Sequence, residues 1–192
     1  MSDLNSKYSR SVYNLGASDG IWVGLAMGLC MMCMIESAKI PFLAFLGLLL
    51  FVAVPVMVWK MLRRAWMLSR VPPSFSAVWL HGICIFLFGG LIMALITYIS
   101  LRYLSPGWIE TQTLEAASRL AGNPDTAEQS LILLRIVESG QLPTPIYTAI
   151  SSIWMVAFTG SLMSMIFAYF LTRTVRFRTL RDQNLKKEFN ER

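Results

Sequence analysis

Two ionisable residues that lie inside apolar stretches are the strongest candidates for chemistry. Asp19 is the only acidic residue well inside such a stretch, and His81 is the only histidine in the chain. Ionisable groups within a membrane are costly and mark functional sites by default. Their predicted depths match, so we expect an Asp19–His81 pair, with Lys60 and Arg173 competing for the carboxylate. Such a pair is either a structural anchor or a proton- or substrate-coupling site.

A second group with chemical potential is the run of cysteine and methionine from Cys30 to Met34. Thiolates and thioethers select Cu(I), but no second Cys, His and Met cluster faces these residues, so we expect them to pack. His81 has no clear second axial ligand for a haem. The sequence also lacks a nucleophile–base pair, paired carboxylates and a phosphate-binding glycine loop. We therefore expect no catalytic residues, no metal and no cofactor, and a protein that is not an enzyme.

The elements that would position these residues are membrane helices. The 192 residues are 55% hydrophobic and only 15% charged, and the mean hydropathy is +0.55. Soluble domains carry about 25% charged residues, whereas a helix of about 20 apolar residues spans a bilayer. The sequence predicts an all-α polytopic membrane protein, a bundle of four transmembrane helices. The predicted spans cover about 15–35, 40–59, 77–101 and 147–171, followed by a basic tail at 172–192, and the segment 60–76 is predicted to be a basic loop.

The distribution of lysine and arginine predicts the orientation. Thirteen basic residues fall on one side of the predicted spans and four on the other. Positive residues mark the cytoplasmic side, so we expect both termini in the cytoplasm. Because the basic residues flank apolar spans, the net charge of +6 indicates membrane topology, and we expect no nucleic-acid partner. The polar first twelve residues and the long first span also predict no cleaved signal peptide.

The segment between the third and fourth spans, about 106–140, is predicted to be helical. Pro106 and Gly107 form a turn, and the apolar spacing after them favours a helix that ends at Gly122. Asn123 is a suitable N-cap for a second helix, which Gly140 would end. We expect two short amphipathic helices outside the cytoplasm. They either lie on the membrane–water interface or cap the bundle.

Small residues recur along the spans at helical spacing. The first span carries Gly16, Gly20, Gly24 and Gly28, four glycines at a strict spacing of four that is typical of a glycine zipper. The fourth span carries a related set, Gly160, Ser164 and Ala168, and the third contains the pair Gly89 and Gly90. Such stripes let helix backbones approach closely. We expect them to pack helices within the chain, with self-association or a partner's helix as the alternative.

Several stretches occur in a familiar order. They are the glycine-rich first span, the basic loop leading into Ser74–Ser76, the segment Thr97–Pro106, and Gly160–Ile166. Over Tyr13–Arg178 the chain resembles the small four-helix membrane proteins of Bacteroidetes catalogued as domain of unknown function family 4199. The resemblance implies the same topology and an inner-membrane location, with machinery for envelope glycans as a partner class. It brings no established activity and no catalytic residues.

Two functions from different classes follow as expectations. The first is a non-catalytic accessory or scaffold protein of cell-envelope biogenesis, acting through helix packing and its extracytoplasmic helices. Its partners would be the lipid bilayer and another membrane protein or a second copy of the chain. The alternative is a small transporter or channel-like component that uses the polar site formed by Asp19 and His81.

Overall fold

The computed structural model describes residues 2–67, 74–122 and 124–190, and these residues form helices and connecting turns without a strand. The elements are α1 (Ser2–Glu36), α2 (Phe42–Met67), α3 (Phe75–Ile99), the π-helical segment η1 (Ser100–Leu104), α4 (Trp108–Ala121), the 3₁₀ turn η2 (Pro124–Thr126), α5 (Ala127–Glu138) and α6 (Pro145–Asn190). The all-α prediction is confirmed.

Four of these helices are long and apolar enough to cross a membrane. The candidate spans are Tyr13–Glu36, Phe42–Trp66, Phe75–Leu104 and Pro145–Thr174. The contacts described below pair the start of α1 with the start of α3, and the end of α2 with the end of α6. Successive spans are therefore antiparallel. Helices α1 and α3 both begin at one end of the bundle, which we call the terminal end. The opposite end contains the link between α1 and α2, and we call it the hairpin end.

One predicted boundary is wrong. The segment after residue 59 was predicted to be a loop, yet α2 continues to Met67 and carries Lys60, Arg63 and Arg64 on a helix. The basic tail predicted from residue 172, whose secondary structure the prediction left open, continues α6, which runs to Asn190. The reason is local. Leu, Met, Ala, Arg and Lys are good helix formers, and neither extension contains a proline or a glycine. Arg70 lies outside the described residues.

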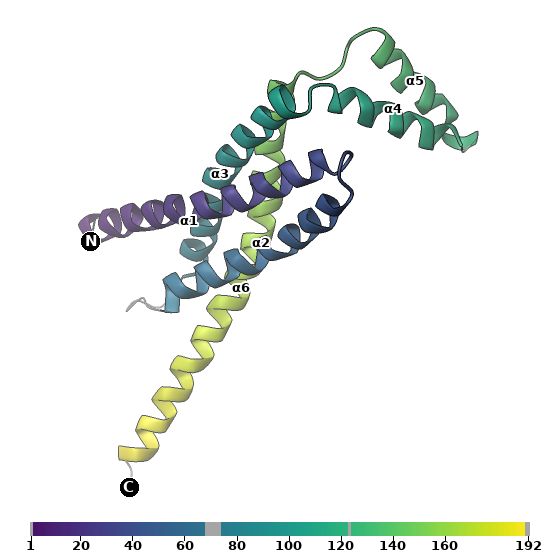
Figure 1. Ribbon diagram of the computed structural model, residues 1–192. Coiled ribbons are helices and arrows are strands. Elements are labelled where there is room, and N and C mark those ends of the chain that lie inside the picture. The colour runs from purple at the N-terminus through teal and green to yellow at the C-terminus, as the bar shows by residue number, and fades with distance from the viewer. Residues whose placement is uncertain (1, 68–73, 123, 191–192) are drawn as a thin grey trace.

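Helix α3 is the centre of the packing. It lies along α1 on one side and along α6 on the other, while α2 packs mainly against α1 (Figure 1). Near the terminal end, α2 also reaches the other helices: Trp66 contacts His81 of α3, and the ring centroids of Trp59 and Phe167 of α6 lie 5.5 Å apart. Residues from all four spans share one apolar core there.

The glycine stripe of α1 faces α3 along its whole length. A methyl group at Gly24 would lie 2.7 Å from the carbonyl oxygen of Gly89, and one at Gly16 would lie 2.6 Å from the Cβ of Cys84. Methyl groups at Gly20 and Gly28 would likewise meet α3, at Phe88 and Ile96 respectively. In this structure the stripe packs two helices of the same chain, with their backbones in direct contact.

The small residues of α6 face the other side of α3. A methyl group at Gly160 would overlap the ring of Phe86, and one at Gly82 would overlap the side chain of Ser164. Ser164 and Ala168 are fully buried, and the Ser164 hydroxyl donates to the carbonyl oxygen of Gly160 at 2.7 Å. Small residues on both helices therefore permit this second close approach.

The outward faces of α2 and α6 are strongly apolar. Bulky side chains are exposed along both helices, among them Phe42, Phe45 and Phe51 of α2 and Trp154 and Phe158 of α6. Exposed apolar surface on this scale is unfavourable in water but matches hydrocarbon. The apolar character of these faces is that of surfaces in a lipid bilayer.

The two predicted helices between the third and fourth spans are present as α4 and α5. Gly107 (φ +90°) begins the first, and Gly140 (φ +67°) follows the second, both in the left-handed region that glycine adopts without strain. The helices pack chiefly on each other and project from the spans (Figure 1), so they do not cap the bundle. The predicted N-cap Asn123 lies outside the described residues.

Candidate functional site

The structure brings Asp19 and His81 together near the terminal end. Oδ2 of Asp19, on α1, lies 3.4 Å from Nε2 of His81, on α3. His81 is completely buried, whereas 25% of the Asp19 side chain is exposed. The two groups are at ion-pair distance without an aligned hydrogen bond, and Nε2 has no hydrogen-bond partner among the described residues. Glycines at positions 16 and 20 make this contact between α1 and α3 close.

A hydrogen bond to the other ring nitrogen of His81 determines which nitrogen carries the proton in the neutral ring. The indole Nε1–H of Trp66 donates to Nδ1 at 3.2 Å, and the two ring centroids lie 6.3 Å apart. An indole nitrogen can only donate, so Nδ1 must be the unprotonated acceptor. The hydrogen-bond network therefore assigns the neutral ring its proton on Nε2, which faces Asp19. The sequence prediction missed Trp66 because it placed this residue in a loop.

Asp19 also lines a groove between α1 and α2 with a volume of about 770 Å³. The lining residues come from facing turns of the two helices: Leu15, Ser18, Asp19, Trp22, Met57, Met61, Arg64 and Ala65. Arg64 is thus the basic residue that shares this space with Asp19. Within the described part of the chain, neither predicted competitor, Lys60 or Arg173, lines the groove or is ion-paired with Asp19. Arg173 donates to the hydroxyl of Tyr169 at 3.2 Å.

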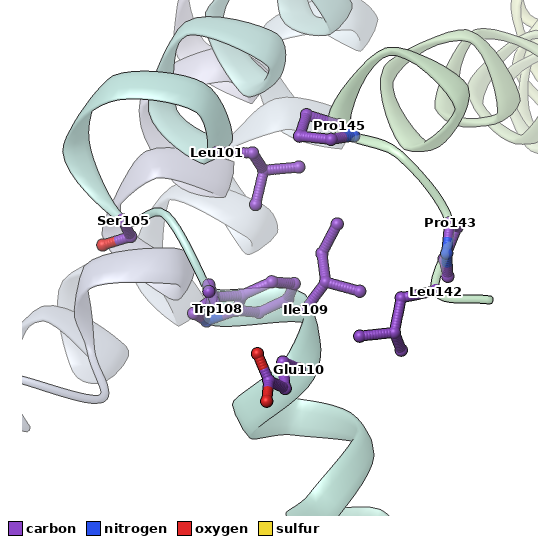
Figure 2. Close-up of a pocket in the computed structure, with 9 residues that line it drawn as sticks. Leu101, Ser105, Trp108, Ile109, Glu110, Leu142, Pro143 and Pro145 are labelled. Carbon is purple, nitrogen blue, oxygen red and sulfur yellow. The ribbon is translucent and has the colours of Figure 1, made fainter. Parts of the chain in front are cut away.

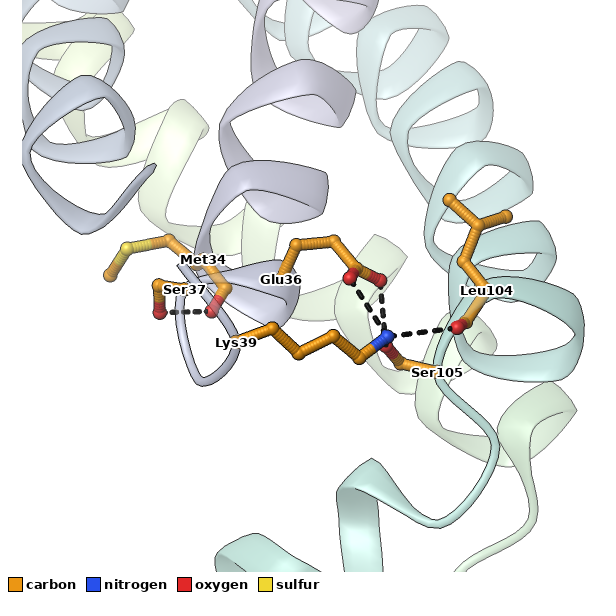
Figure 3. Close-up of polar contacts among 6 residues, drawn as sticks. All are labelled: Met34, Glu36, Ser37, Lys39, Leu104 and Ser105. Atoms are coloured by element: carbon orange, nitrogen blue, oxygen red, sulfur yellow. Dashed lines mark hydrogen bonds and ion pairs between the residues drawn. The ribbon is translucent and has the colours of Figure 1, made fainter. Parts of the chain in front are cut away.

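A second polar cluster joins the spans at the hairpin end (Figure 3). Lys39, in the link between α1 and α2, donates to Glu36 Oε2 at 2.9 Å, to the Leu104 carbonyl oxygen at 3.1 Å and to Ser105 Oγ at 2.8 Å. The Ser105 hydroxyl in turn donates to Glu36 Oε1 at 2.6 Å. We call these four residues the Lys39 cluster. It fastens the first helical hairpin to η1, from which α4 departs.

A small pocket of about 160 Å³ lies at the base of α4 (Figure 2). Trp108 and Ile109 form one side of it, and Leu142 and Pro143 lie opposite them. The indole Nε1 of Trp108 has no hydrogen-bond partner among the described residues. The pocket has room for one small group, and Ser105 and Glu110 add polar side chains to its lining.

The cysteines serve packing in this structure. Cys30, Cys33 and Cys84 are free and buried, and the Cys30 thiol donates to the carbonyl oxygen of Gly47 at 3.2 Å, joining α1 to α2. Within residues 2–67, 74–122 and 124–190, no three His, Cys, Asp or Glu side chains gather in a group that could hold a metal ion.

The match to a known family covers most of this architecture. Residues 19–173, from Asp19 of α1 almost to the end of the last candidate span, match the model described as protein of unknown function (DUF4199). The chain belongs to this family. The matched region begins within the first span and covers the other spans as far as residue 173, together with the α4–α5 hairpin. It includes Asp19, His81, Trp66 and the Lys39 cluster. Neither a curated protein nor a solved structure matches the chain with significance.

Proposed function

We propose that the protein is a non-catalytic accessory or scaffold protein of the bacterial inner membrane, acting in cell-envelope biogenesis. The observation that carries the proposal is the α4–α5 hairpin, which projects from the membrane spans and packs chiefly on itself (Figure 1). A projecting hairpin with exposed apolar side chains supports a role in binding another protein outside the membrane. The excess of lysine and arginine at the terminal end supports cytoplasmic termini and an extracytoplasmic hairpin.

The stripes of small residues indicate which surfaces pack within the chain and which remain for a partner. The stripes of α1 and α6 both face α3. These close-packing surfaces are therefore occupied by a helix of the same chain, as in an intramolecular glycine zipper. Recognition of a partner then falls to surfaces that remain exposed. On the hairpin these include Leu114, Leu131 and Ile132, whose side chains are 41%, 63% and 51% exposed.

The Lys39 cluster supports the idea that the base of the α4–α5 hairpin is held in place. It joins the carbonyl oxygen of Leu104 to the loop between the first two spans. Binding surfaces that are held in place lose less conformational entropy when they bind. A scaffold benefits from this arrangement because its hairpin is already oriented when the partner arrives.

A second function, a small transporter or channel-like component, is favoured by one observation. The groove of about 770 Å³ reaches Asp19, which lies 3.4 Å from His81. This candidate predicts a homo-oligomer with a polar path through it. The scaffold predicts instead a second protein in stoichiometric amount.

Co-purification under mild detergent separates the two candidates. The protein is isolated from its native membrane, and the mass and composition of the particle are measured. We expect a stoichiometric partner that is lost when Leu131 and Ile132 are both replaced by serine. The matched control replaces Phe158, on the lipid-facing side of α6, with leucine and should retain the partner. A homo-oligomer without a second protein, or a partner retained by the double variant, would contradict the scaffold function.

A further inference from the structure

The groove between α1 and α2 combines opposite charges with an apolar wall. Asp19 comes from α1 and Arg64 from α2, and Ser18 adds a hydroxyl beside them. The rest of the lining is apolar or aromatic: Leu15, Trp22, Met57, Met61 and Ala65. The candidate span of α2 ends at Trp66 and that of α1 begins at Tyr13. The charged part of the groove is therefore expected near the terminal-end interface, where lipid headgroups lie.

The two charges share the groove without neutralising each other. Among the described residues, ion pairs join Glu36 to Lys39 and Glu115 to Arg119, Asp19 lies beside the imidazole of His81, and no ion pair joins Asp19 to Arg64. Arg64 is exposed, so its guanidinium is accessible to a ligand. Separated charges of opposite sign complement a ligand that carries both signs, and this excludes a simple anion or cation as the best occupant.

Each group has a matching feature in a phospholipid headgroup. The guanidinium of Arg64 suits a phosphate, which it can bind through two parallel hydrogen bonds. The carboxylate of Asp19 accepts hydrogen bonds from an ammonium group. Trp22 lies one helical turn after Asp19, and its side chain is 63% exposed, so the indole face can add a cation–π contact. The methionines of α2 line the groove where an acyl chain would lie.

His81 supports the carboxylate from behind the groove. Its Nε2 faces Oδ2 of Asp19 at 3.4 Å, while Trp66 holds the ring through Nδ1. This arrangement orients the Asp19 carboxylate, whose Oδ2 faces His81, and the Oδ1 atom takes no part in that contact. His81 is therefore a positioning residue for the ligand-binding carboxylate.

From these observations we propose that the groove is a binding site for a zwitterionic phospholipid whose headgroup ends in a primary ammonium, such as phosphatidylethanolamine. The phosphate binds Arg64 and the ammonium binds Asp19. A choline headgroup lacks N–H donors for the carboxylate, and a glycerol headgroup lacks the positive charge. The site does not depend on the proposed scaffold function, since it uses no residue of the α4–α5 hairpin.

The test measures lipid retention by the purified full-length protein in mild detergent, using native mass spectrometry. Phosphatidylethanolamine, phosphatidylcholine and phosphatidylglycerol with identical acyl chains are added in equal amounts. We expect the ethanolamine lipid to be retained about fivefold over each of the others, as expected for one favourable charge contact at an interface. Asp19→Asn should abolish this preference. Arg64→Gln should weaken retention of all three lipids because all three carry the phosphate.

The control for the arginine is Arg63→Gln, which removes an exposed charge from the adjacent position outside the groove. It should leave both retention and preference unchanged. Equal retention of the three lipids by the wild-type protein would overturn the proposal, as would Arg63→Gln and Arg64→Gln having the same effect. If Asp19→Asn does not give a folded protein by size-exclusion chromatography, the wild-type preference and the pair of arginine variants decide the question.

Discussion

Replacing Gly24 with alanine tests whether the backbone contact between α1 and α3 holds the spans together. The added methyl group would lie 2.7 Å from the carbonyl oxygen and 2.9 Å from the Cα of Gly89, and 2.9 Å from the Cβ of Ile92. Two of these three atoms belong to the backbone. Neither can rotate aside as a side chain would, so the helices themselves must separate.

The change in the free energy of unfolding caused by Gly24→Ala is the sum of two opposing contributions. Overpacking of a close-packed interior costs about 1–3 kcal/mol, and contacts with backbone atoms place this site in the upper half of that range. Alanine in place of glycine returns about 0.5–1 kcal/mol through helix propensity. The net loss is about 1–2.5 kcal/mol, which lowers the folding equilibrium constant roughly 5- to 60-fold.

The assay is reversible unfolding of the purified protein in mixed micelles, followed by the loss of helical circular dichroism as the fraction of denaturing detergent rises. Gly90→Ala is the matched control, because it adds the same methyl group to α3 one residue after Gly89. There the nearest atom is the Cγ1 of Val156 at 3.5 Å, an ordinary contact. We expect Gly90→Ala to be neutral or slightly stabilising.

The comparison of the two variants decides the outcome. If Gly24→Ala is as stable as Gly90→Ala, the stripe does not carry the packing of α1 on α3, and the reasoning from the glycine contacts is refuted. A loss in both variants of equal size would also refute it, because helix propensity predicts a gain at both positions.

Two further predictions concern the polar contacts. Lys39→Met keeps the length of the side chain but removes its hydrogen bonds, including that to the carbonyl oxygen of Leu104; we expect about 1 kcal/mol of destabilisation and faster backbone hydrogen exchange in η1. Trp66→Phe removes the donor to Nδ1 of His81; we expect a loss of about 1–3 kcal/mol, and ¹⁵N NMR of the imidazole should show a mixture of tautomers instead of one.

Each of these predictions has a control. Arg119→Met breaks an exposed pair with Glu115 at 3.9 Å and should change neither stability nor exchange in η1. For the tryptophan, Trp154→Phe alters a residue on the outward face of α6 that is 75% exposed and should leave the imidazole signals unchanged. Unaltered exchange in Lys39→Met, or a single tautomer in Trp66→Phe, would contradict the respective prediction.

The sequence predicted the helices well because their signals are local. Apolar blocks located the four spans, and glycines 107 and 140 marked the limits of the outer helices, where the structure has positive φ angles. The boundary at residue 59 failed because hydropathy changes there while helix propensity does not. That single error also hid Arg64 and Trp66, two residues that face Asp19 and His81 respectively from α2.

The partners of the small residues could not be predicted from the sequence. Spacing of four shows that Gly16 to Gly28 share one face, but it does not say which helix lies on that face. The pair in α3 illustrates the difficulty. Gly89 contacts α1 and Gly90 contacts α6, because adjacent residues on a helix point about 100° apart. Only the three-dimensional arrangement reveals that α3 serves both neighbours.

The hydrogen-bond network around His81 constrains what the polar site can do. Protonating Nδ1 would place two N–H donors against each other, since the indole of Trp66 already points at that nitrogen. A proton relay through the ring would therefore have to break this buried hydrogen bond in each cycle, at a cost of about 1–3 kcal/mol for the unsatisfied donor. A ring that only orients the Asp19 carboxylate keeps the bond intact. The geometry thus favours a fixed His81 and assigns ligand contact to Asp19, the member of the pair that reaches the groove.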